Sequence, residues 1–334
     1  MDFYRKLARK PRIFLSTTGM TIHAFQKLLP QFEAAFLNLQ QQRKKRTVRS
    51  DSARQRQIGG GRSFNNDLAN QLLMLLLYYR LYLTQDFMTL LFHAENKSLI
   101  CRNIQLMKAV FEAVLPTPER AKKRLLSLAK AETQRRKKRI GSLEEFKEAY
   151  PELTFIIDGV EQAKRKPKDK EKRKGDYSGK KKRHTRKQLL ISTPNGIIVD
   201  QSPSCGGRQH DFQAFKDDHA KREPCKEFQE HRVCLYGDSG FQGMQELDLG
   251  VEVRVIQRAR RNHPLTREEK KLNRLRSSTR VKVEHTIGRR KKYRIAAEEY
   301  RNRDGDYDQT MNIVAGLVNL RAYERVFQTT GVQM

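Results

Sequence analysis

Three acidic residues stand in contexts that suit the binding of a divalent cation. Asp158 ends an apolar run, Asp238 follows a second short apolar run, and Glu284 lies in a charged segment. An ionised acid at the end of a buried strand destabilises the fold unless a partner neutralises it, and Mg²⁺ prefers carboxylate oxygens. The alternative is that the two aspartates, each closely followed by glycine, only form turns. Taken singly, each acid leaves both interpretations open.

Short apolar runs predict a mixed β-sheet that carries the two aspartates. The predicted strands are residues 153–158, 188–192, 197–200, 233–236 and 251–256. A Thr-Pro-Asn-Gly turn joins the second strand to the third as a hairpin. Helices are predicted at 212–228 and from 266 to about 292, the latter containing Glu284. A mixed sheet with late helices predicts an α/β catalytic domain of the ribonuclease H-like type.

The N-terminal third is predicted to be helical, which makes the whole chain α+β. Residues 21–39 carry apolar side chains at helical spacing, and a basic, mobile linker is predicted at 43–62. Further helices are predicted at 68–82, 84–92 and 97–115, followed by a basic helical segment at 116–150. The turn at 93–96 resembles that of a helix-turn-helix, in which Lys97, Arg102 and Asn103 would meet DNA. A plain three-helix bundle is the alternative.

The charge balance predicts a polyanionic partner. The chain has 334 residues, with 69 lysines and arginines against 38 aspartates and glutamates, and a formal net charge of +31. Such an excess suits nucleic acid. No apolar stretch approaches the ~20 residues that a membrane-spanning helix needs, and the N-terminus lacks a secretory signal. We therefore expect a cytoplasmic protein that binds DNA and no membrane.

The four cysteines predict neither a disulfide framework nor a structural zinc site. Cys101, Cys205, Cys225 and Cys234 are irregularly spaced and include no Cys-x-x-Cys pair. Reduced thiols are the expected state. A metal cluster of the last three with His210 is a weaker alternative, because it lacks the close ligand pairs of zinc modules.

Basic residues flank the acids on both sides. The stretch 164–187 is so basic that a simple solvated loop explains it poorly, and we predict a DNA-gripping loop beside Asp158. On the helix of Glu284, Arg280 and Gly288 lie one turn to either side, where the arginine would hold phosphate and the glycine would leave room for DNA. The predicted contacts in these two segments are Lys180, Lys181, Lys182, Arg183, His184, Arg280, Arg289 and Arg290.

Glu161 and the histidines are assigned lesser roles. The offset of three residues puts Glu161 on the opposite face of the strand from Asp158, so we expect a structural role. His184, His210 and His285 are expected to form hydrogen bonds or contact phosphate, and neutral surface histidines are the alternative.

Several motifs occur along the chain in an order that is typical of one protein family. They are Asp158-Gly159-x-Glu161, the run from Tyr177 to Thr185, His210-Asp211, the run from Gly237 to Gly243, and the run from Val283 to Arg289. In this order they resemble the DDE transposases of the bacterial insertion sequence five group and their Harbinger-type relatives. The segment from Phe14 to Met20, followed by Phe25, resembles the N-terminal module of that family. The resemblance thus covers nearly the whole chain.

The resemblance implies an insertion-sequence transposase, an enzyme of metal-dependent phosphodiester hydrolysis and transesterification. Asp158 would bridge two Mg²⁺ ions, for which Mn²⁺ would substitute, while Asp238 and Glu284 would each hold one. Such an enzyme binds terminal inverted repeats, cleaves DNA and joins the 3′-hydroxyl ends to target DNA. Its implied partners are DNA and further copies of itself, in a homodimer or higher oligomer. It would act at the bacterial nucleoid without a small-molecule cofactor.

We predict four parts: an N-terminal helical segment with linker (1–62), a helix-turn-helix domain (63–116), a basic connector (117–150) and a catalytic domain (151–328). Two other functions compete. One is a catalytically silent or domesticated transposase that acts as a DNA-binding regulator, against which the intact acids argue. The other is a metal-dependent, structure-selective nuclease that cuts without joining, against which only the resemblance argues.

Overall fold

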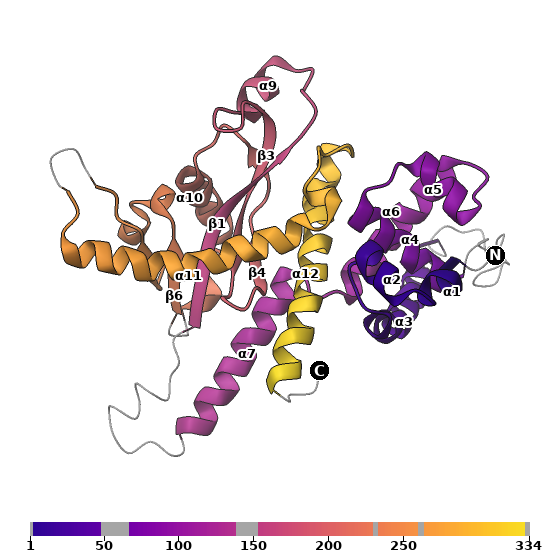
Figure 1. The fold of residues 1–334 in the computed structure, drawn as a ribbon, viewed down its shortest axis with the longest axis horizontal. Helices are drawn as coiled ribbons and strands as arrows, with labels where there is room; N and C mark the ends of the chain where they lie inside the picture. The colour runs from indigo at the N-terminus through magenta and orange to yellow at the C-terminus, as the bar shows by residue number, and fades with distance from the viewer. Residues whose placement is uncertain (1–2, 48–66, 138–152, 230–232, 260–263, 331–334) are drawn as a thin grey trace. The chain divides into compact units, whose positions relative to one another are not determined.

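The computed structural model describes residues 3–47, 67–137, 153–229, 233–259 and 264–330, and the chain divides into two compact units. Unit 1 comprises residues 1–115 with 292–295, and unit 2 comprises 116–291 with 296–334. Unit 1 is helical, while unit 2 contains the sheet (Figure 1). The chain therefore has the predicted α+β layout, and the finer division into four parts stays a prediction.

The described part of unit 1 consists of helices. They are α1 (Phe3–Ala8), α2 (Pro11–Thr18), α3 (Ile22–Thr47), α4 (Leu68–Leu81), α5 (Gln85–Phe92) and α6 (Lys97–Val114). Three of them begin after a side chain that accepts a backbone N–H, namely Asp67, Thr84 and Asn96. Such caps satisfy donors that the first helical turn leaves unpaired. The helices predicted at 68–82, 84–92 and 97–115 are confirmed.

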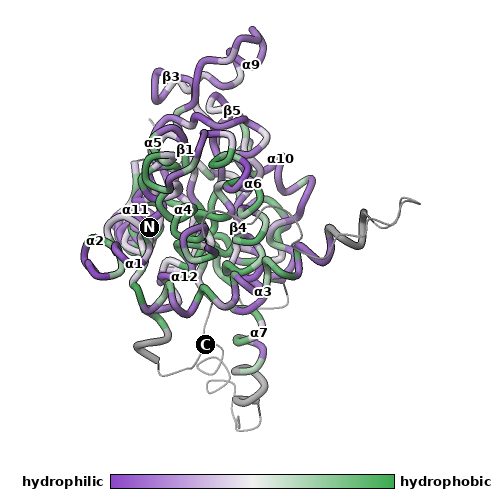
Figure 2. The backbone as a smooth tube through the Cα atoms, turned by 90° about the vertical axis from the view of Figure 1, so that its right-hand side faces the viewer, coloured by the Kyte–Doolittle hydropathy of each residue, from purple (hydrophilic) through white to green (hydrophobic). Residues whose placement is uncertain are grey.

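Helix α4 forms the centre of unit 1. Its side chains from Asn70 to Tyr79 are all buried, and Figure 2 shows the helix as hydrophobic along most of its length. It contacts α2, α3, α5 and α6. The ring of Tyr79 packs edge-on against Phe111, with centroids 6.3 Å apart. A helix that is apolar on all sides is expected at the centre of such a bundle.

One predicted boundary in the basic N-terminal sequence is wrong. Helix α3 continues to Thr47, beyond residue 43, the predicted start of the linker. Glutamine, lysine and arginine are good helix formers, so basic composition alone does not end a helix. The remaining linker residues, 48–62, lie outside the described part of the chain. Helix α7 (Pro118–Lys137) accounts for the described part of the predicted connector, whose residues 138–150 also lie outside it.

The strands of unit 2 form one mixed sheet, as predicted. In spatial order it runs β2 (Tyr177–Ser178), β3 (Arg183–Ser192), β1 (Leu153–Ala163), β6 (Val233–Gly237) and β7 (Glu252–Val255). Two further strands, β4 (Ile198–Gln201) and β5 (Cys205–Gly206), also pair with β3. β1 is antiparallel to β3 and parallel to β6, and β6 is parallel to β7. β1 therefore lies at the centre, hydrogen-bonded on both sides.

β1 and β3 are longer than the apolar runs that predict them. β1 extends to Ala163, so Asp158 lies in the middle of the strand rather than at its end. The antiparallel ladder continues because Glu161 faces Lys187 across the two strands. Opposite charges in such cross-strand pairs stabilise a polar stretch of sheet.

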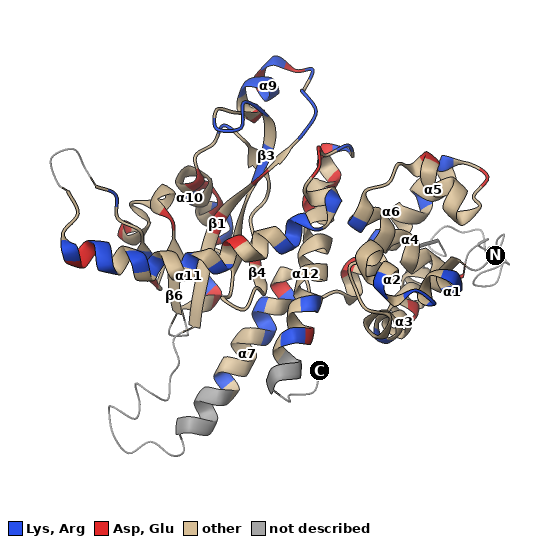
Figure 3. Ribbon diagram, in the orientation of Figure 1, with Lys and Arg blue, Asp and Glu red and all other residues tan. Residues whose placement is uncertain are grey.

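The prediction of a basic loop at 164–187 is largely wrong, because β3 also extends into this stretch. Its residues from Arg183 onward belong to β3, and helix α9 (Lys170–Asp176) and β2 occupy its middle. Only the segments 165–169 and 179–182 connect these elements without helix or strand. Figure 3 shows lysines and arginines gathered over α9 and the adjoining start of β3. The basic stretch is therefore a structured hairpin with a short helix.

The described part of unit 2 has three longer helices besides α7. Helix α11 (Arg267–Lys291) confirms the helix predicted at 266–292, while α12 (Tyr307–Thr330) was not anticipated from the sequence. Helix α10 (Asp211–Arg222) is shorter than the prediction at 212–228. It ends at Glu223, which has a left-handed conformation with φ of 46° and precedes Pro224. Proline disfavours the helical conformation in the residue that precedes it, which explains why α10 ends earlier than predicted.

The two faces of the sheet meet different helices. Phe155, Ile157 and Leu189 belong to a core that also includes side chains from α7, α10 and α12. Helix α11 contacts β1 and β6. Because successive strand residues point to opposite faces, Asp158 points away from the core that holds Ile157. On that other face, Arg290 of α11 donates a hydrogen bond to Gln188 of β3 at 2.7 Å.

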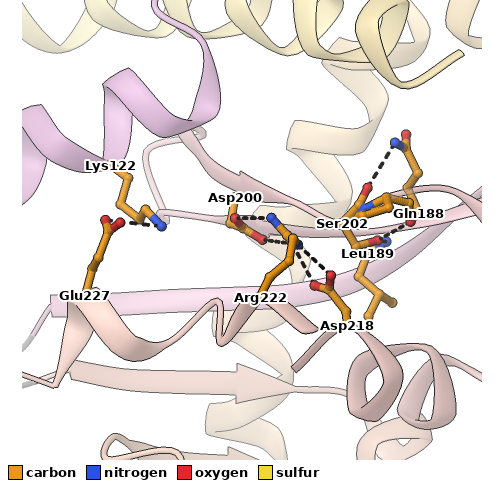
Figure 4. A network of polar contacts seen from close by, with 9 residues as sticks. Lys122, Gln188, Leu189, Asp200, Ser202, Asp218, Arg222 and Glu227 are labelled. Atoms are coloured by element: carbon orange, nitrogen blue, oxygen red, sulfur yellow. Dashed lines mark hydrogen bonds and ion pairs between the residues drawn. The ribbon is translucent and has the colours of Figure 1, made fainter. Parts of the chain in front are cut away.

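Ion pairs that each join a buried charge to a more exposed one hold α10 and α7 in place (Figure 4). Arg222 of α10 lies 3.1 Å from Asp200 of β4 and 2.6 Å from Asp218. Burial raises the pKa of Asp200, and Arg222 opposes this rise. Lys122 of α7 pairs with Glu227 at 3.2 Å. Because removal of one partner would leave a buried charge uncompensated, these contacts fix the helices on the sheet.

Two sequence-level questions concern the thiols and the membrane. The four cysteines are free, and burial raises the pKa of Cys205 to about 11 and that of Cys225 to about 12. Both thiols are therefore protonated at neutral pH. No helix among the described residues combines the length and the apolar character needed to cross a membrane.

Candidate active site

Asp158 lies in β1, and Asp238 directly follows the adjacent strand β6. The parallel pairing of β1 with β6 matches Ile156 with Tyr236, and each aspartate lies two residues further along its chain. Neighbouring strands are about 4.8 Å apart, and residues two apart in a strand share a face. The strand register therefore brings both carboxylates to the face of the sheet that α11 contacts.

The surroundings of Asp158 oppose its ionisation. Burial is the largest cause of a pKa raised to about 6, and the negative charges of Asp238 and Asp211 act in the same direction. The backbone N–H of Gly159, 2.8 Å from Oδ1, and the guanidinium of Arg280 oppose the rise. The ionised form of Asp158 is thus incompletely compensated by the protein, and additional positive charge would stabilise it.

The chain after β6 orients Asp238. Its Oδ1 accepts the N–H of Gly240 at 2.7 Å, and it caps the short helix η2 (Ser239–Phe241). A Cβ on residue 240 would lie 2.9 Å from this oxygen, so only glycine lets the turn close over the carboxylate. The turn role considered from the sequence is therefore real for Asp238. No hydrogen bond or ion pair joins its other oxygen to the described residues, which leaves that oxygen for a ligand.

Arg280 links the third acid to the first. Its guanidinium lies 2.6 Å from Oε1 of Glu284, one helical turn away, and 3.9 Å from Oδ2 of Asp158. Helix α11 thus carries Glu284 to the face of the sheet that holds the aspartates. The side chain of Arg280 is 26% exposed and that of Glu284 is 48% exposed, so solvent screens this pair and limits what it contributes to stability.

The three acids do not form a ready-made metal site. In the ranges that the structure describes, no three His, Cys, Asp or Glu side chains are grouped closely enough to hold an ion. Arg280 occupies the position between Asp158 and Glu284 instead. The donors nevertheless suit a hard divalent cation, because they are carboxylate oxygens and burial and repulsion leave Asp158 in need of positive charge. The residues present therefore fit such a cation at Asp158 and Asp238.

A fourth acid, Asp211, lies close to the aspartate pair. It is the first residue of α10, and its Oδ1 is 2.8 Å from Nζ of Lys187. Lys187 is 6% exposed, and its Nζ also lies 3.5 Å from Glu161. Burial alone would lower the pKa of Lys187, but Asp211 and Glu161 outweigh it and raise that pKa. The lysine therefore stays charged inside the protein and neutralises two acids, one of them Glu161, as its predicted structural role requires.

Asp211 also explains the glycine after Asp158. A Cβ on residue 159 would lie 2.8 Å from Oδ1 of Asp211, so glycine lets the start of α10 approach β1. Sequence reasoning missed both Asp211 and Lys187. Lys187 was counted within a basic loop, and no spacing along the chain connects Asp211 with Asp158. The only available signal was the motif His210-Asp211 at the start of a predicted helix.

The sequence of unit 2 is similar to sequences of known proteins. Residues 157–319 match the family described as DDE superfamily endonuclease, a range that contains Asp158, Asp238 and Glu284. A relative from Microchaete diplosiphon is 26% identical over 253 residues, which are 75% of this chain and 80% of the relative. It is described as the probable transposase for insertion sequence element IS702. Both matches support a DDE transposase family. No solved structure matches the chain.

Most of the basic residues predicted to contact DNA are accessible to solvent. Lys97, Arg102, Lys180, Lys181, Lys182 and Arg183 are exposed, and Asn103, His184 and Arg289 are half-buried. Lys97 lies 3.8 Å from Asp86, and Arg183 lies 3.0 Å from Glu299. Both pairs are solvent-exposed and therefore weak enough to be exchanged for a phosphate. His210 and His285 are also exposed, which leaves their predicted roles open.

Arg290 differs from these residues. It is 2% exposed and donates to Gln188. A guanidinium enclosed in this way has no surface to offer a phosphate, so we leave Arg290 out of the proposed DNA contacts. Helical spacing carried the signal, because Val283 and Thr286, seven and four residues earlier, are buried on the same face of α11.

The raised pKa of Asp158 predicts a pH-dependent gain in stability on Asp158→Asn. Because the folded protein binds this proton more tightly than the unfolded chain, wild-type stability falls as pH rises from about 4 to about 6. A shift from 3.8 to about 6 corresponds to at most about 3 kcal/mol. Urea unfolding in the presence of a chelator should show the variant more stable than wild type at pH 8, with the difference vanishing towards pH 4.

The exposed Asp248 provides the control. Asp248→Asn should leave the free energy of unfolding unchanged relative to wild type across this pH range. A difference between Asp158→Asn and wild type that is absent at pH 8, or that grows towards acid pH, would show that Asp158 is not strained in its ionised form.

Proposed function

We propose that this chain is the transposase of an insertion sequence. Its reaction is the binding of terminal inverted repeats, the cleavage of DNA with a divalent metal, and the joining of the 3′-hydroxyl ends to target DNA. The observation that carries the proposal is the arrangement of the acids: Asp158 lies on β1, Asp238 directly follows the adjacent parallel strand β6, and Glu284 lies on the helix that contacts both strands. The match to DDE superfamily endonuclease over the same residues supports it.

The finer classification is part of the proposal. We assign unit 2 to the ribonuclease H-like folds and the chain to the insertion sequence five group. The support for the fold is a sheet in which β4, β3 and β1 are antiparallel neighbours, followed by the parallel strands β6 and β7. The support for the group is the order of motifs around the three acids, together with the relative described for insertion sequence element IS702.

Asp158, Asp238 and Glu284 are the residues that would hold divalent ions, Mg²⁺ or Mn²⁺, with Asp158 shared between two of them. Ions bound there would lower the pKa of water and stabilise negative charge on the leaving oxygen of a phosphodiester. The protein contributes the placement of the carboxylates: β1 holds Asp158, the end of β6 holds Asp238, and α11 holds Glu284. Arg280, which contacts two of the acids, is the basic residue that we propose for the phosphate beside the reacting bond.

The positive charge outside the site supports DNA as the substrate. The net charge is +31, and Lys180, Lys181 and Lys182 are exposed at the turn between β2 and β3. This hairpin continues the same β3 that pairs with β1 beside Asp158. Lysines on an exposed turn bind phosphates through charge and give no sequence specificity. We therefore propose that the hairpin holds DNA near the site irrespective of sequence.

Helices α5 and α6 would recognise the transposon end. His93 ends α5 in a left-handed conformation with φ of 49°, and the side chain of Asn96 caps α6. Such a tight connection suits a helix-turn-helix. Lys97 and Arg102 are exposed on the first turns of α6, where a recognition helix meets DNA. The proposal for α6 is therefore sequence-specific binding.

Two ends must be brought together for transposition, so we propose a homodimer or higher oligomer on DNA. We also propose that the protein acts at the bacterial nucleoid in the cytoplasm, since DNA is its substrate. Neither a membrane nor a small-molecule cofactor enters the proposed reaction.

The proposal predicts that Asp158→Asn, Asp238→Asn and Glu284→Gln each lower DNA cleavage roughly a thousandfold or more, because each removes a carboxylate that stabilises the reacting charge. Binding to DNA that carries the inverted repeats should stay within about twofold. The assay is a supercoiled plasmid with an element bounded by the repeats that flank this reading frame, incubated with Mg²⁺ and analysed for nicks and for insertions.

Glu268→Gln is the matched control, because Glu268 is an exposed acid on the same helix as Glu284. It should cleave and insert at the wild-type rate. Substantial cleavage by any of the three acid variants would remove that residue from the site. Nicks without insertions in the wild type would indicate a nuclease, and binding without nicks would indicate a regulator.

The proposed role of α6 predicts a loss of sequence discrimination. Arg102→Ala with Asn103→Ala should weaken binding to the inverted repeat more than binding to random duplex, by roughly 1–3 kcal/mol for each side chain that reads a base. Competition binding with the two DNAs at one salt concentration measures the ratio. Gln105→Ala, an exposed substitution further along α6, is the control. Equal weakening on both DNAs would reduce α6 to a scaffold.

A further inference from the structure

A pocket with basic and aromatic walls lies at the far end of the β2–β3 hairpin. Its volume is about 560 Å³, within the usual range for small-ligand sites. It is lined by Lys166, Arg173, Lys174, Tyr177, Gly179, His184 and Arg208. These residues come from the segment after β1, from α9, from both strands of the hairpin, and from the segment after β5. The pocket is built entirely within unit 2.

The aromatic wall has an exposed face. Tyr177 and His184 are direct partners across β2 and β3, and their rings meet edge-on with centroids 5.6 Å apart. This contact fixes the orientation of the tyrosine ring. Tyr177 is nevertheless 42% exposed, a large value for an aromatic side chain. An exposed, immobilised ring of this kind provides a flat surface on which another ring can stack.

Three of the four lysine and arginine side chains that line the pocket have no acidic partner among the described residues. Arg173 donates to the carbonyl oxygens of Pro167 and Lys168, at 3.3 and 3.0 Å, which fixes its guanidinium without a counter-charge. Within the described ranges, the side chains of Lys166 and Arg208 have neither a hydrogen bond nor an ion pair. The backbone N–H of Arg208 donates to the carbonyl oxygen of Gly175 at 3.1 Å, which ties its segment to α9.

Two acids near the pocket are paired with lysines, of which one, Lys174, lines the pocket. Asp176 pairs at 2.8 Å with Lys164, which is buried and also lies 2.7 Å from Asp304. Glu171 pairs with Lys174 at 3.3 Å on the exposed side of α9. No acid lines the pocket itself. Apart from Lys174, the cationic side chains of the pocket therefore have no acidic partner among the described residues, and they surround one aromatic ring in the most basic part of the hairpin (Figure 3).

From this arrangement we infer that the pocket binds an unpaired nucleotide within a single-stranded segment of DNA. The base would stack on Tyr177, and the flanking phosphates would lie among Lys166, Arg173 and Arg208. Such a combination of stacking ring and cationic groove is the usual means of binding single strands. In duplex DNA the base faces are covered by their neighbours and cannot reach a ring. The aromatic wall thus distinguishes this pocket from the exposed lysines at 180–182, which any DNA phosphate can satisfy.

The inference deepens the proposed function, on which it rests for DNA as the ligand. Strand cleavage leaves free DNA ends, at which bases unpair more readily than they do within a continuous duplex. A pocket for an unpaired nucleotide on the hairpin that extends from β3 would hold such an end on the same sheet as Asp158. Binding needs no catalysis, so it can be measured while the acids are inactive.

The test is binding of the full chain, with Asp158→Asn and a chelator present, to a labelled single-stranded oligonucleotide and to its duplex. Tyr177→Ala should weaken single-strand binding roughly 5- to 150-fold, and duplex binding should stay within about twofold. Tyr177→Phe, which keeps the ring, should bind as the parent does. A 2-aminopurine base in the single strand should lose fluorescence on binding to the parent protein, and should lose much less on binding to Tyr177→Ala.

A second variant tests the basic wall without touching the ring. Lys166→Gln with Arg208→Gln should lower the slope of log affinity against log salt by about 1.4 on single strands, since each phosphate contact contributes about 0.7. Leu128→Ala, at an exposed apolar residue of α7, is the control. It should leave the binding of both the single strand and the duplex unchanged. Equal weakening on single strand and duplex with Tyr177→Ala, or no weakening on either, would overturn the inference.

The plasmid assay separates this inference from the proposed function. If the wild type cleaves and inserts DNA while Tyr177→Ala binds single strands normally, the pocket assignment fails alone. If the wild type neither cleaves nor inserts but binding to single strands depends on Tyr177, the pocket stands and the proposed reaction fails.

Discussion

The carboxylates of Asp158 and Asp238 lie near each other, just beyond the residues through which β1 and β6 pair in parallel. Because Asp158 is buried, the repulsion between the two negative charges destabilises its ionised form. Other features of unit 2 follow from this contact. Arg280 reaches across from α11 to supply part of the missing positive charge, and glycines at 159 and 240 leave space for the acids and their hydrogen bonds. Lys187 neutralises Asp211 and Glu161, so that the further acids nearby do not add to the strain. Proteins keep strain of this kind where it serves function, and here a divalent cation would relieve it.

The charge of the molecule is divided in a way that suits the proposed reaction. Acids converge on one face of the sheet, while lysines and arginines cover the hairpin of β2 and β3, α9 and much of α11 (Figure 3). Strand β3 connects the two regions, because its Leu190 pairs with Asp158 of β1 and its Arg183 lies in the hairpin. A polyanion bound along the hairpin would be directed towards the acids, whose own negative charge would repel it until cations are present. In this account, DNA binding and metal binding support each other through electrostatics.

Much of this arrangement could be predicted from sequence because it rests on local signals. The apolar runs before Asp158 and Asp238 predict their strands, and helical patterns in the N-terminal third predict the helices of unit 1. The rest depends on partners that are distant in the chain. The polar half of β1 is a strand only because Lys187 faces Glu161, and Asp211 approaches Asp158 only because α10 packs against β1 at Gly159. The prediction that Arg290 contacts DNA is wrong. The basic composition of its segment indicated a surface position, whereas the helical spacing indicated the interior.

Binding of Mg²⁺ to the full chain without DNA tests the central claim most directly. Calorimetric titration at pH 8, paired with thermal unfolding at equal ionic strength, would report both affinity and stabilisation. Because a ligand that binds only the folded state stabilises it by mass action, Mg²⁺ should raise the unfolding temperature of the wild type. This rise should be absent in Asp158→Asn and in Asp238→Asn, and Glu268→Gln should retain it. Equal stabilisation of the wild type and Asp158→Asn, or none in either, would contradict the claim that these two aspartates form a cation site.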